Sequence, residues 1–266
     1  MTSTRMVDLR VRAPVVRPVC TGLYEPAPGG KACRGPSRRA ASYATSMNPD
    51  RPAPRPGAWW AVGVAVVVAA PLLAASLHAQ GGGPGTVAGW ALGIALTWTV
   101  GGLVIMRLAP PEQPRRDLRR APLITVAAVG VGLAAASLAG GLVLAGIPAT
   151  AAWVTGPVAA AADGRWGVLA VALLAGAGEE VFFRGALPRL LSGLARWMVP
   201  TAVYAAVTLC TGSPALAAMA LLLGPVAMWA REITGSLAGA LYVHALWTLT
   251  MVGLFPIVLA AAGLAG

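Results

Sequence analysis

The chain has 266 residues, of which 57% are hydrophobic and 11% are charged. This composition is typical of membrane proteins with several spans and excludes an ordinary soluble globular domain. The net charge of +11 comes from arginines in the N-terminal region and between apolar segments. No basic stripe is interleaved with aromatic residues, so the charge indicates membrane topology and argues against a nucleic-acid partner.

Residues 1–57 are rich in Arg, Pro, Ser and Gly and lack an apolar run long enough for a span or a signal peptide. We predict that they form a disordered, basic tail on the cytoplasmic side. Met47 offers a second start directly before the first apolar run. We therefore hypothesise that residues 1–46 come from an over-long gene model, which N-terminal sequencing of the native protein tests.

The rest of the sequence predicts an all-α fold, a polytopic transmembrane helix bundle of about seven spans. Residues 58–147 are expected to hold three N-terminal helices, at 58–78, 87–108 and 122–147. The loop PPEQPRRDLRR after the second of them contains four arginines, and the positive-inside rule places it in the cytoplasm. Four further apolar segments follow, two of them short for a bilayer core, at 166–189, 200–211, 215–229 and 236–254.

Two adjacent acidic residues, Glu179 and Glu180, lie inside a long apolar run. A carboxylate in hydrocarbon costs about 2.5 kcal/mol or more, so this pair predicts a functional site. Glu180 and Arg184 are four residues apart with the acid first, the favourable order for a helical ion pair. Glu179 points about 100° away from Glu180 around the helix. The alternative is that the charged residues form only an internal salt bridge.

Three predicted helices bring polar side chains to a similar depth. By helical rise, Glu179, Thr208 and His244 lie about 12 to 15 Å from the cytoplasmic ends of their helices. A carboxylate that faces an imidazole in a partly dry cavity is suited to activate water, and this arrangement favours hydrolysis. The alternative for His244 is a structural histidine that is hydrogen-bonded to a neighbour.

The sequence resembles the CAAX-protease and bacteriocin-processing family of intramembrane endopeptidases, also called the CPBP or Abi family. The resemblance lies in Glu179-Glu180-x-x-x-Arg184-Gly185 and in Arg231-x-x-Thr234-Gly235-Ser236-Leu237, which leads to His244. It covers about residues 166–254 and suggests a CPBP-like intramembrane protease domain at residues 148–266. It implies an all-helical membrane fold around a cavity open to the cytoplasm, where water attacks a peptide bond.

The resemblance also implies roles for individual residues. Glu179 would be the water-activating base, Glu180 and Arg184 would orient and stabilise the site, and His244 would be the matching histidine. The implied substrate is a membrane-associated or prenylated peptide presented at the lipid bilayer.

Two positions depart from the family pattern. Its second motif is an aromatic residue, three residues and a histidine, whereas this chain has Tyr204 followed by Thr208. Its third motif ends in asparagine, whereas His244 is followed by Thr248. A catalytic zinc normally has three protein ligands. The candidate metal ligands Glu179 and His244 make two, with Glu180 as a conceivable third, so the sequence argues against a firmly held zinc.

A metal-free route remains open from the sequence. In it, Glu179 activates water and either Thr208 or Thr248 donates a hydrogen bond to the developing oxyanion. Loss of such a donor typically costs a hundredfold or more in rate, so these substitutions bring catalytic activity into question.

The first interpretation is therefore an intramembrane endopeptidase, a multi-pass protein of the cell membrane with a cytoplasmic N-terminus. The second is a pseudoprotease without catalysis, which uses the same scaffold for binding or immunity. The third is a proton-coupled transporter in which the charged residues form a proton relay, but the sequence shows neither a through-path nor repeated halves.

Overall fold

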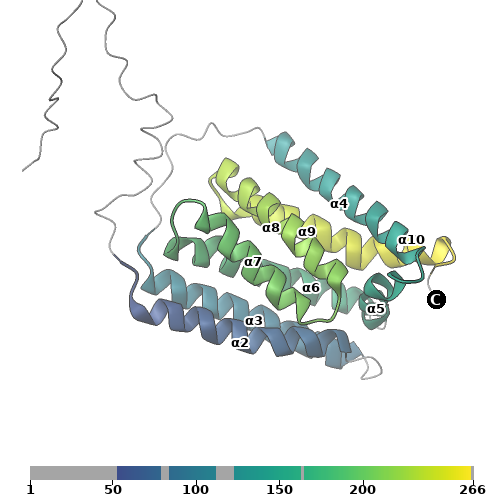
Figure 1. Ribbon diagram of the computed structural model, residues 1–266, viewed down its shortest axis with the longest axis horizontal. Helices are drawn as coiled ribbons and strands as arrows, with labels where there is room; N and C mark the ends of the chain where they lie inside the picture. Colours follow the sequence, from purple (N-terminus) through teal and green to yellow (C-terminus); the bar gives the residue numbers. More distant parts are fainter. Residues whose placement is uncertain (1–52, 79–83, 112–122, 163–164, 265–266) are drawn as a thin grey trace, which may run out of the picture. The chain divides into compact units, whose positions relative to one another are not determined.

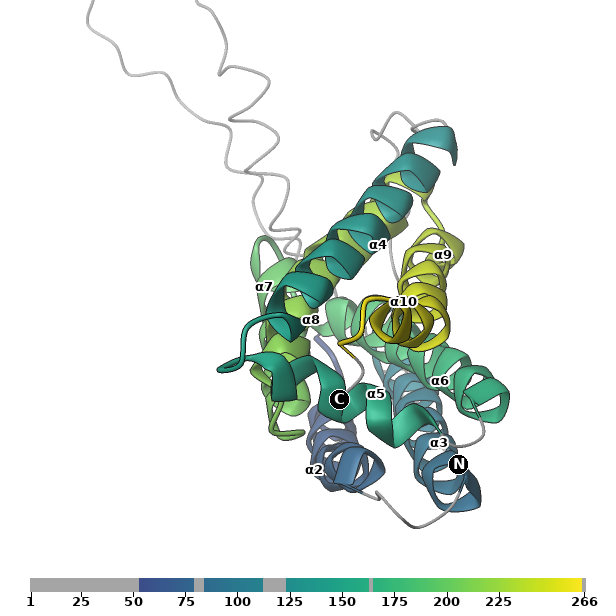
Figure 2. The same cartoon turned by 90° about the vertical axis from the view of Figure 1, so that its right-hand side faces the viewer.

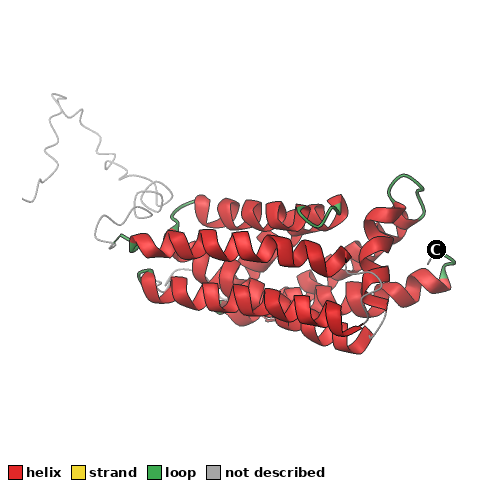
Figure 3. Cartoon of the chain, turned by 90° about the horizontal axis from the view of Figure 1, so that it is seen from below, coloured by secondary structure: helices red, strands yellow, loops and turns green. Residues whose placement is uncertain are grey.

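The computed structural model describes residues 53–78, 84–111, 123–162 and 165–264. Every element within these ranges is helical (Figure 3), which confirms the predicted all-α fold. The predicted tail lies outside the described residues up to position 52, as do Met47 and residues 112–122 of the arginine-rich loop. The elements, in chain order, are α2 (Pro56–His78), α3 (Pro84–Leu108), α4 (Leu123–Ala145), α5 (Ala151–Ala162), α6 (Arg165–Glu179), η1 (Glu180–Ala186), η2 (Leu187–Leu190), α7 (Ala195–Leu209), α8 (Pro214–Thr234), α9 (Leu237–Thr248), η3 (Leu249–Leu254) and α10 (Phe255–Ala261).

Six helical segments in the described part of the chain are long and apolar enough to cross a membrane, which makes this an integral membrane protein. They are Pro56–His78, Gly85–Leu108, Leu123–Ala145, Trp166–Leu190, Pro214–Thr234 and Leu237–Ala261. The prediction of about seven spans is close to this number. The segment expected at 200–211 is α7, whose 15 residues extend for about 22 Å and are too short for a core of about 30 Å.

Helix α6, which carries the glutamates, packs against α3 and α9. The pair α2 and α3 lies side by side beneath it in Figure 1, and Figure 2 shows the bundle from one end. Gly178 allows the close approach of α6 to α3, since a Cβ atom there would lie 2.8 Å from the Ala95 carbonyl oxygen. Next to this contact, the Trp98 ring lies 4.7 Å from the Phe182 ring and 4.9 Å from the Phe183 ring. These contacts fix the position of α6 and η1.

The turn between α8 and α9 explains the Thr-Gly-Ser sequence at 234–236. Gly235 ends α8 with φ 66° and ψ 16°, a left-handed conformation that costs glycine little. Ser236 caps α9, because its side-chain oxygen accepts a hydrogen bond from the Ala238 amide at 3.2 Å. The chain therefore reverses within two residues, and α9 packs along α8.

Candidate active site

Both glutamates are buried where the α-helix changes into a π-helix. Glu179 is the last residue of α6 and is 8% exposed, while Glu180 begins η1 and is fully buried. Short π-helical turns inside longer helices are rare and often occur at functional sites. A second π-helix, η3, follows directly after the helix that carries His244.

Glu180 binds two cationic or polar partners through one oxygen. The Arg184 Nη1 atom donates to Glu180 Oε1 at 2.9 Å, and both side chains are buried. His244 Nδ1 lies 2.6 Å from the same oxygen, across 64 residues of sequence. The predicted ion pair between Glu180 and Arg184 is therefore present. Glu180 also contacts the histidine, which had been expected to share its cavity with Glu179.

Glu179 faces the other nitrogen of the imidazole ring. Its Oε2 atom lies 3.8 Å from His244 Nε2, which is too long for a direct hydrogen bond but close enough for electrostatic attraction. The two carboxylates therefore bracket the ring. With both carboxylates ionised and Arg184 charged, a protonated His244 brings the net charge of the four groups to zero.

Tyr204 on α7 contacts the site from a third helix. Its ring centroid lies 6.5 Å from that of His244. The Arg184 guanidinium lies over the Tyr204 ring at 5.0 Å, a cation–π contact. The tyrosine is 7% exposed, so both contacts are shielded from surrounding solvent.

Gly176 provides the space that His244 occupies. A Cβ atom at this position would lie 3.0 Å from His244 Nε2 and 3.1 Å from Cδ2. Such a distance is tighter than an ordinary van der Waals contact. Because Gly176 is four residues before Glu180, it lies one helical turn away on the same side of the helix. The missing side chain thus lets the imidazole reach both glutamates.

The two threonines differ in their surroundings. Thr208 is buried, and its hydroxyl donates to the Tyr204 carbonyl oxygen at 2.8 Å. Its single proton is directed at the backbone, so this conformation does not support the expected role as an oxyanion donor. Thr248 is 3% exposed and lies one turn after His244 on α9, so its place is compatible with that role.

The residues present do not fit a metal ion. Within the described residues, no three His, Cys, Asp or Glu side chains are grouped so that they could hold one. Glu180 Oε1 is already bound to both Arg184 and His244, which leaves Glu179 and His244 Nε2 as two facing donors. We assign no step to a metal.

Two buried polar atoms of the site have no hydrogen-bond partner in the described structure. They are Glu180 Oε2 and Arg184 Nη2. Buried polar atoms are nearly always hydrogen-bonded, and each exception calls for an explanation. Glu180 Oε2 is an acceptor and Arg184 Nη2 is a donor, so a polar ligand could form a hydrogen bond with each of them.

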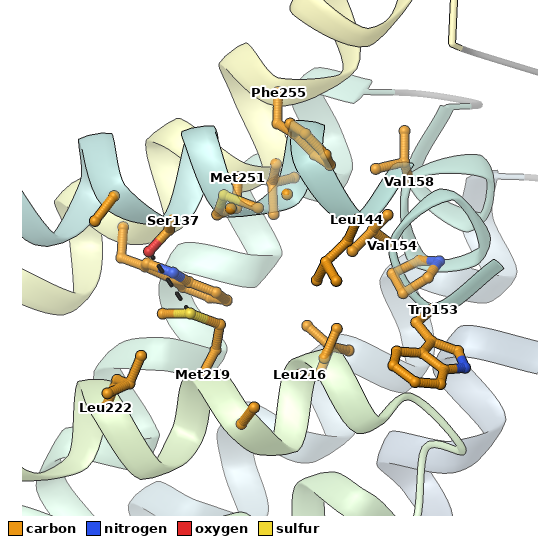
Figure 4. A pocket seen from close by; sticks show the side chains of 18 of the residues that line it. Ser137, Leu144, Trp153, Val154, Val158, Leu216, Met219, Leu222, Met251 and Phe255 are labelled. Carbon is orange, nitrogen blue, oxygen red and sulfur yellow. Dashed lines mark hydrogen bonds between the residues drawn. The ribbon is translucent and has the colours of Figure 1, made fainter. Parts of the chain in front are cut away.

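A separate apolar pocket of about 290 Å³ lies between α4, α5, α8 and the end of α9 with η3 and α10 (Figure 4). Figure 4 shows Leu144, Leu216 and Met251 directed into it. The Ser137 hydroxyl beside the pocket donates to the Leu133 carbonyl oxygen at 2.7 Å, so the pocket surface is almost entirely apolar.

Trp247 connects this pocket to the charged site. It contributes to the pocket wall, and its ring meets the His244 ring edge-on with centroids 6.1 Å apart. The pocket and the catalytic candidates are therefore neighbours that share one side chain.

Sequence reasoning assigned no role to Gly176, Tyr204 or Trp247. Gly176 is four residues before Glu180, and Trp247 is three residues after His244, so helical spacing alone places both beside the charged residues. Tyr204 was noted as the aromatic residue of a family motif. Its contacts with Arg184 and His244 join it to other helical segments, and no spacing within one helix predicts them.

Fold and site together define an all-helical membrane protein with a buried Glu-Glu-Arg-His cluster. Residues 161–250 match the family model described as type II CAAX prenyl endopeptidase Rce1-like. The matched segment is about a third of the chain, and the match confirms the resemblance seen in the sequence. It contains every charged residue of the cluster, as well as Tyr204 and both threonines. Searches of the curated proteins and of the solved structures gave no significant match.

Proposed function

We propose that this protein is an intramembrane endopeptidase that hydrolyses a peptide bond with a water molecule activated by Glu179. The observation that carries the proposal is the placement of two buried carboxylates on the two nitrogens of one imidazole, with contacts of 2.6 Å and 3.8 Å. Charged groups inside a membrane bundle are costly and are kept mainly where they act.

In the proposed reaction, Glu179 and Glu180 have different roles, because they have different contacts. Glu180, held by Arg184, accepts a hydrogen bond from His244 Nδ1 and orients the ring. Glu179 and His244 Nε2 then face a common space in which both can hydrogen-bond one water. Glu179 takes a proton from this water while the oxygen attacks the peptide carbonyl carbon. The same proton passes to the leaving nitrogen as the C–N bond breaks.

The unpaired atoms of the site suit a peptide backbone. Arg184 Nη2 is a donor for a carbonyl oxygen, and Glu180 Oε2 is an acceptor for an amide N–H. We assign the remaining oxyanion hydrogen bond to Thr248, because the Thr208 hydroxyl is bound to the backbone. Donors that face the developing charge typically contribute a hundredfold or more to the rate.

The apolar pocket favours a substrate with a hydrocarbon chain. Its lining offers almost no hydrogen-bonding group, and it shares Trp247 with the charged site. A prenyl or similar chain attached to the peptide would occupy this pocket while the scissile bond lies near Glu179. The arginines near the end of this helical segment, Arg189 and Arg196, favour a cytoplasmic entry.

A cleavage assay tests the proposal. The purified protein in lipid vesicles is incubated with a pooled library of membrane-anchored peptides, and the products are identified by mass spectrometry. Wild type is compared with Glu179→Ala and with Thr208→His. Products that form with wild type and not with Glu179→Ala support an active protease.

A non-catalytic binding protein is the second candidate, favoured by the threonine at position 208 in place of the family histidine. It predicts an inert wild type. A gain of cleavage in Thr208→His would then identify a scaffold that has lost its chemistry.

A further inference from the structure

We propose that the apolar pocket takes up an acyl chain of a bilayer phospholipid through an opening between α4 and α8. The proposed function assigns the same pocket to the hydrocarbon chain of a substrate, so the lipid chain fills it while no substrate is bound. The inference does not depend on catalysis, because uptake of a lipid chain requires only the pocket and its opening.

The pocket opens on the surface of the bundle between two spans. Four residues both line the pocket and are exposed, namely Ala136 and Gly140 on α4 and Ala218 and Leu222 on α8. A Cβ atom added at Gly140 would meet nothing within 4 Å, whereas one added at the next residue, Gly141, would lie 2.9 Å from the Phe255 ring. The pocket is therefore open on the side of Gly140 and closed by packing on the side of Gly141.

This opening lies at the depth of the hydrocarbon core. Helices α4 and α8 are both long and apolar enough to span a membrane. The Ser213 hydroxyl before α8 donates to the Trp153 carbonyl oxygen on α5 at 2.7 Å, so α8 begins on the side of the bundle where α4 ends. By helical rise, the four exposed residues lie about 6 to 14 Å from these two helix ends. At such depths, an exposed residue of a span faces lipid chains.

An acyl chain suits the pocket better than water or a headgroup does. The lining is almost entirely apolar, so a polar or charged group inside it would lose its hydrogen bonds to water without replacement. An empty pocket of about 290 Å³ would leave its lining without dispersion contacts on one side. A hydrocarbon chain restores these contacts, and it is the part of a phospholipid that lies at the depth of the opening.

The inner wall of the pocket leads toward the charged site. Met251 on η3 is directed into the pocket (Figure 4). Trp247, one helical turn before it, also lines the pocket, and its ring centroid lies 6.1 Å from that of His244. A chain that enters between α4 and α8 therefore extends toward His244 and occupies the space proposed for the substrate chain.

Photolabelling with a phosphatidylcholine that carries a diazirine at the end of one acyl chain tests the proposal. The purified protein in vesicles that contain this lipid is irradiated, and labelled residues are mapped by mass spectrometry. Leu254 is 45% exposed and should be labelled by the surrounding lipid. Met251 should be labelled as well, because a chain inside the pocket reaches it. Label at Leu254 without label at Met251 in the wild-type protein overturns the proposal.

Ala218→Trp places an indole at the rim of the opening, so the label at Met251 should be lost while the label at Leu254 remains. The matched control is Leu221→Trp, because Leu221 is 53% exposed on the same helix but does not line the pocket. It should keep both labels. Equal label at Met251 in wild type and Ala218→Trp overturns entry between α4 and α8.

The labelling result is separate from the cleavage assay of the proposed function. A protein that cleaves peptides but is not labelled at Met251 refutes this inference alone. An inert protein whose Met251 label is lost only in Ala218→Trp supports the lipid site and refutes the proposed function alone.

Discussion

Glu180 Oε1 and His244 Nδ1 are 2.6 Å apart, although 64 residues separate them in the chain. The same oxygen accepts a hydrogen bond from Arg184. One buried carboxylate thus joins the start of η1 to the middle of α9 and neutralises an arginine inside the bundle.

Glu180→Ala should destabilise the protein by about 3–5 kcal/mol, because it leaves the Arg184 charge unpaired in the bundle. Thermal unfolding in detergent measures this loss. The double variant Glu180→Leu/Arg184→Leu is the control, since it removes both charges and should recover much of the stability. A melting temperature equal to that of wild type in Glu180→Ala would show that the pair does not hold the fold together.

Gly176→Ala should reduce cleavage by about a hundredfold, because its Cβ atom would lie 3.0 Å from His244 Nε2 and displace the ring. Helix propensity favours alanine by about 1 kcal/mol, whereas displacement of the ring weakens the 2.6 Å contact between His244 and Glu180, so activity is the quantity that decides. Gly167→Ala on the same helix meets nothing within 4 Å and serves as the control. Equal activity of both variants would contradict the close packing of His244 on α6.

Part of this site can be predicted from the sequence, because it depends on the hydropathy of single spans and on residue spacing within one helix. Hydropathy locates the spans because each must match the bilayer thickness, and the four-residue spacing predicts the pair of Glu180 and Arg184. The 100° angle between adjacent helical residues suggested that one glutamate alone would face His244. An imidazole presents two nitrogens, however, and the structure places one carboxylate at each.

The contacts between side chains on different helices could not be predicted from the sequence. Tyr204 contacts Arg184 and His244 from α7, and this depends on how α7 packs rather than on any spacing. The first residue of α7 was also predicted incorrectly. Pro200 was expected to open the helix, whereas it lies inside α7, which begins at Ala195. A proline interior to a helix is tolerated when neighbouring groups satisfy the freed carbonyl.

Thr248→Val should lower kcat by about tenfold to a hundredfold if the hydroxyl supports the oxyanion. Thr208→Val should have less than about threefold effect, because its hydroxyl is bonded to the Tyr204 carbonyl oxygen. Both substitutions preserve the side-chain shape, so the comparison isolates the hydroxyl. Initial rates at saturating peptide decide the matter, and the reverse order of effects would transfer the oxyanion role to Thr208.

Gly140→Leu should fill part of the apolar pocket, since Gly140 lines it and an added Cβ atom meets nothing within 4 Å. We expect KM to rise for a peptide that carries a hydrocarbon chain and to stay constant for the same peptide without the chain. Gly132→Leu on the same helix is the control, because Gly132 is also open but does not line the pocket. An equal KM for the lipid-bearing peptide in both variants would place the chain elsewhere.

In the proposed mechanism, Glu179 is the base of a peptide hydrolysis. The most direct measurement is the kcat of Glu179→Gln on a peptide that the wild-type protein cleaves in lipid vesicles. Glu232→Gln is the matched control, because Glu232 lies on α8 beside Arg196, outside the cluster. We expect a loss of at least about a thousandfold in Glu179→Gln and near wild-type activity in Glu232→Gln. Cleavage by Glu179→Gln at the wild-type rate would contradict it.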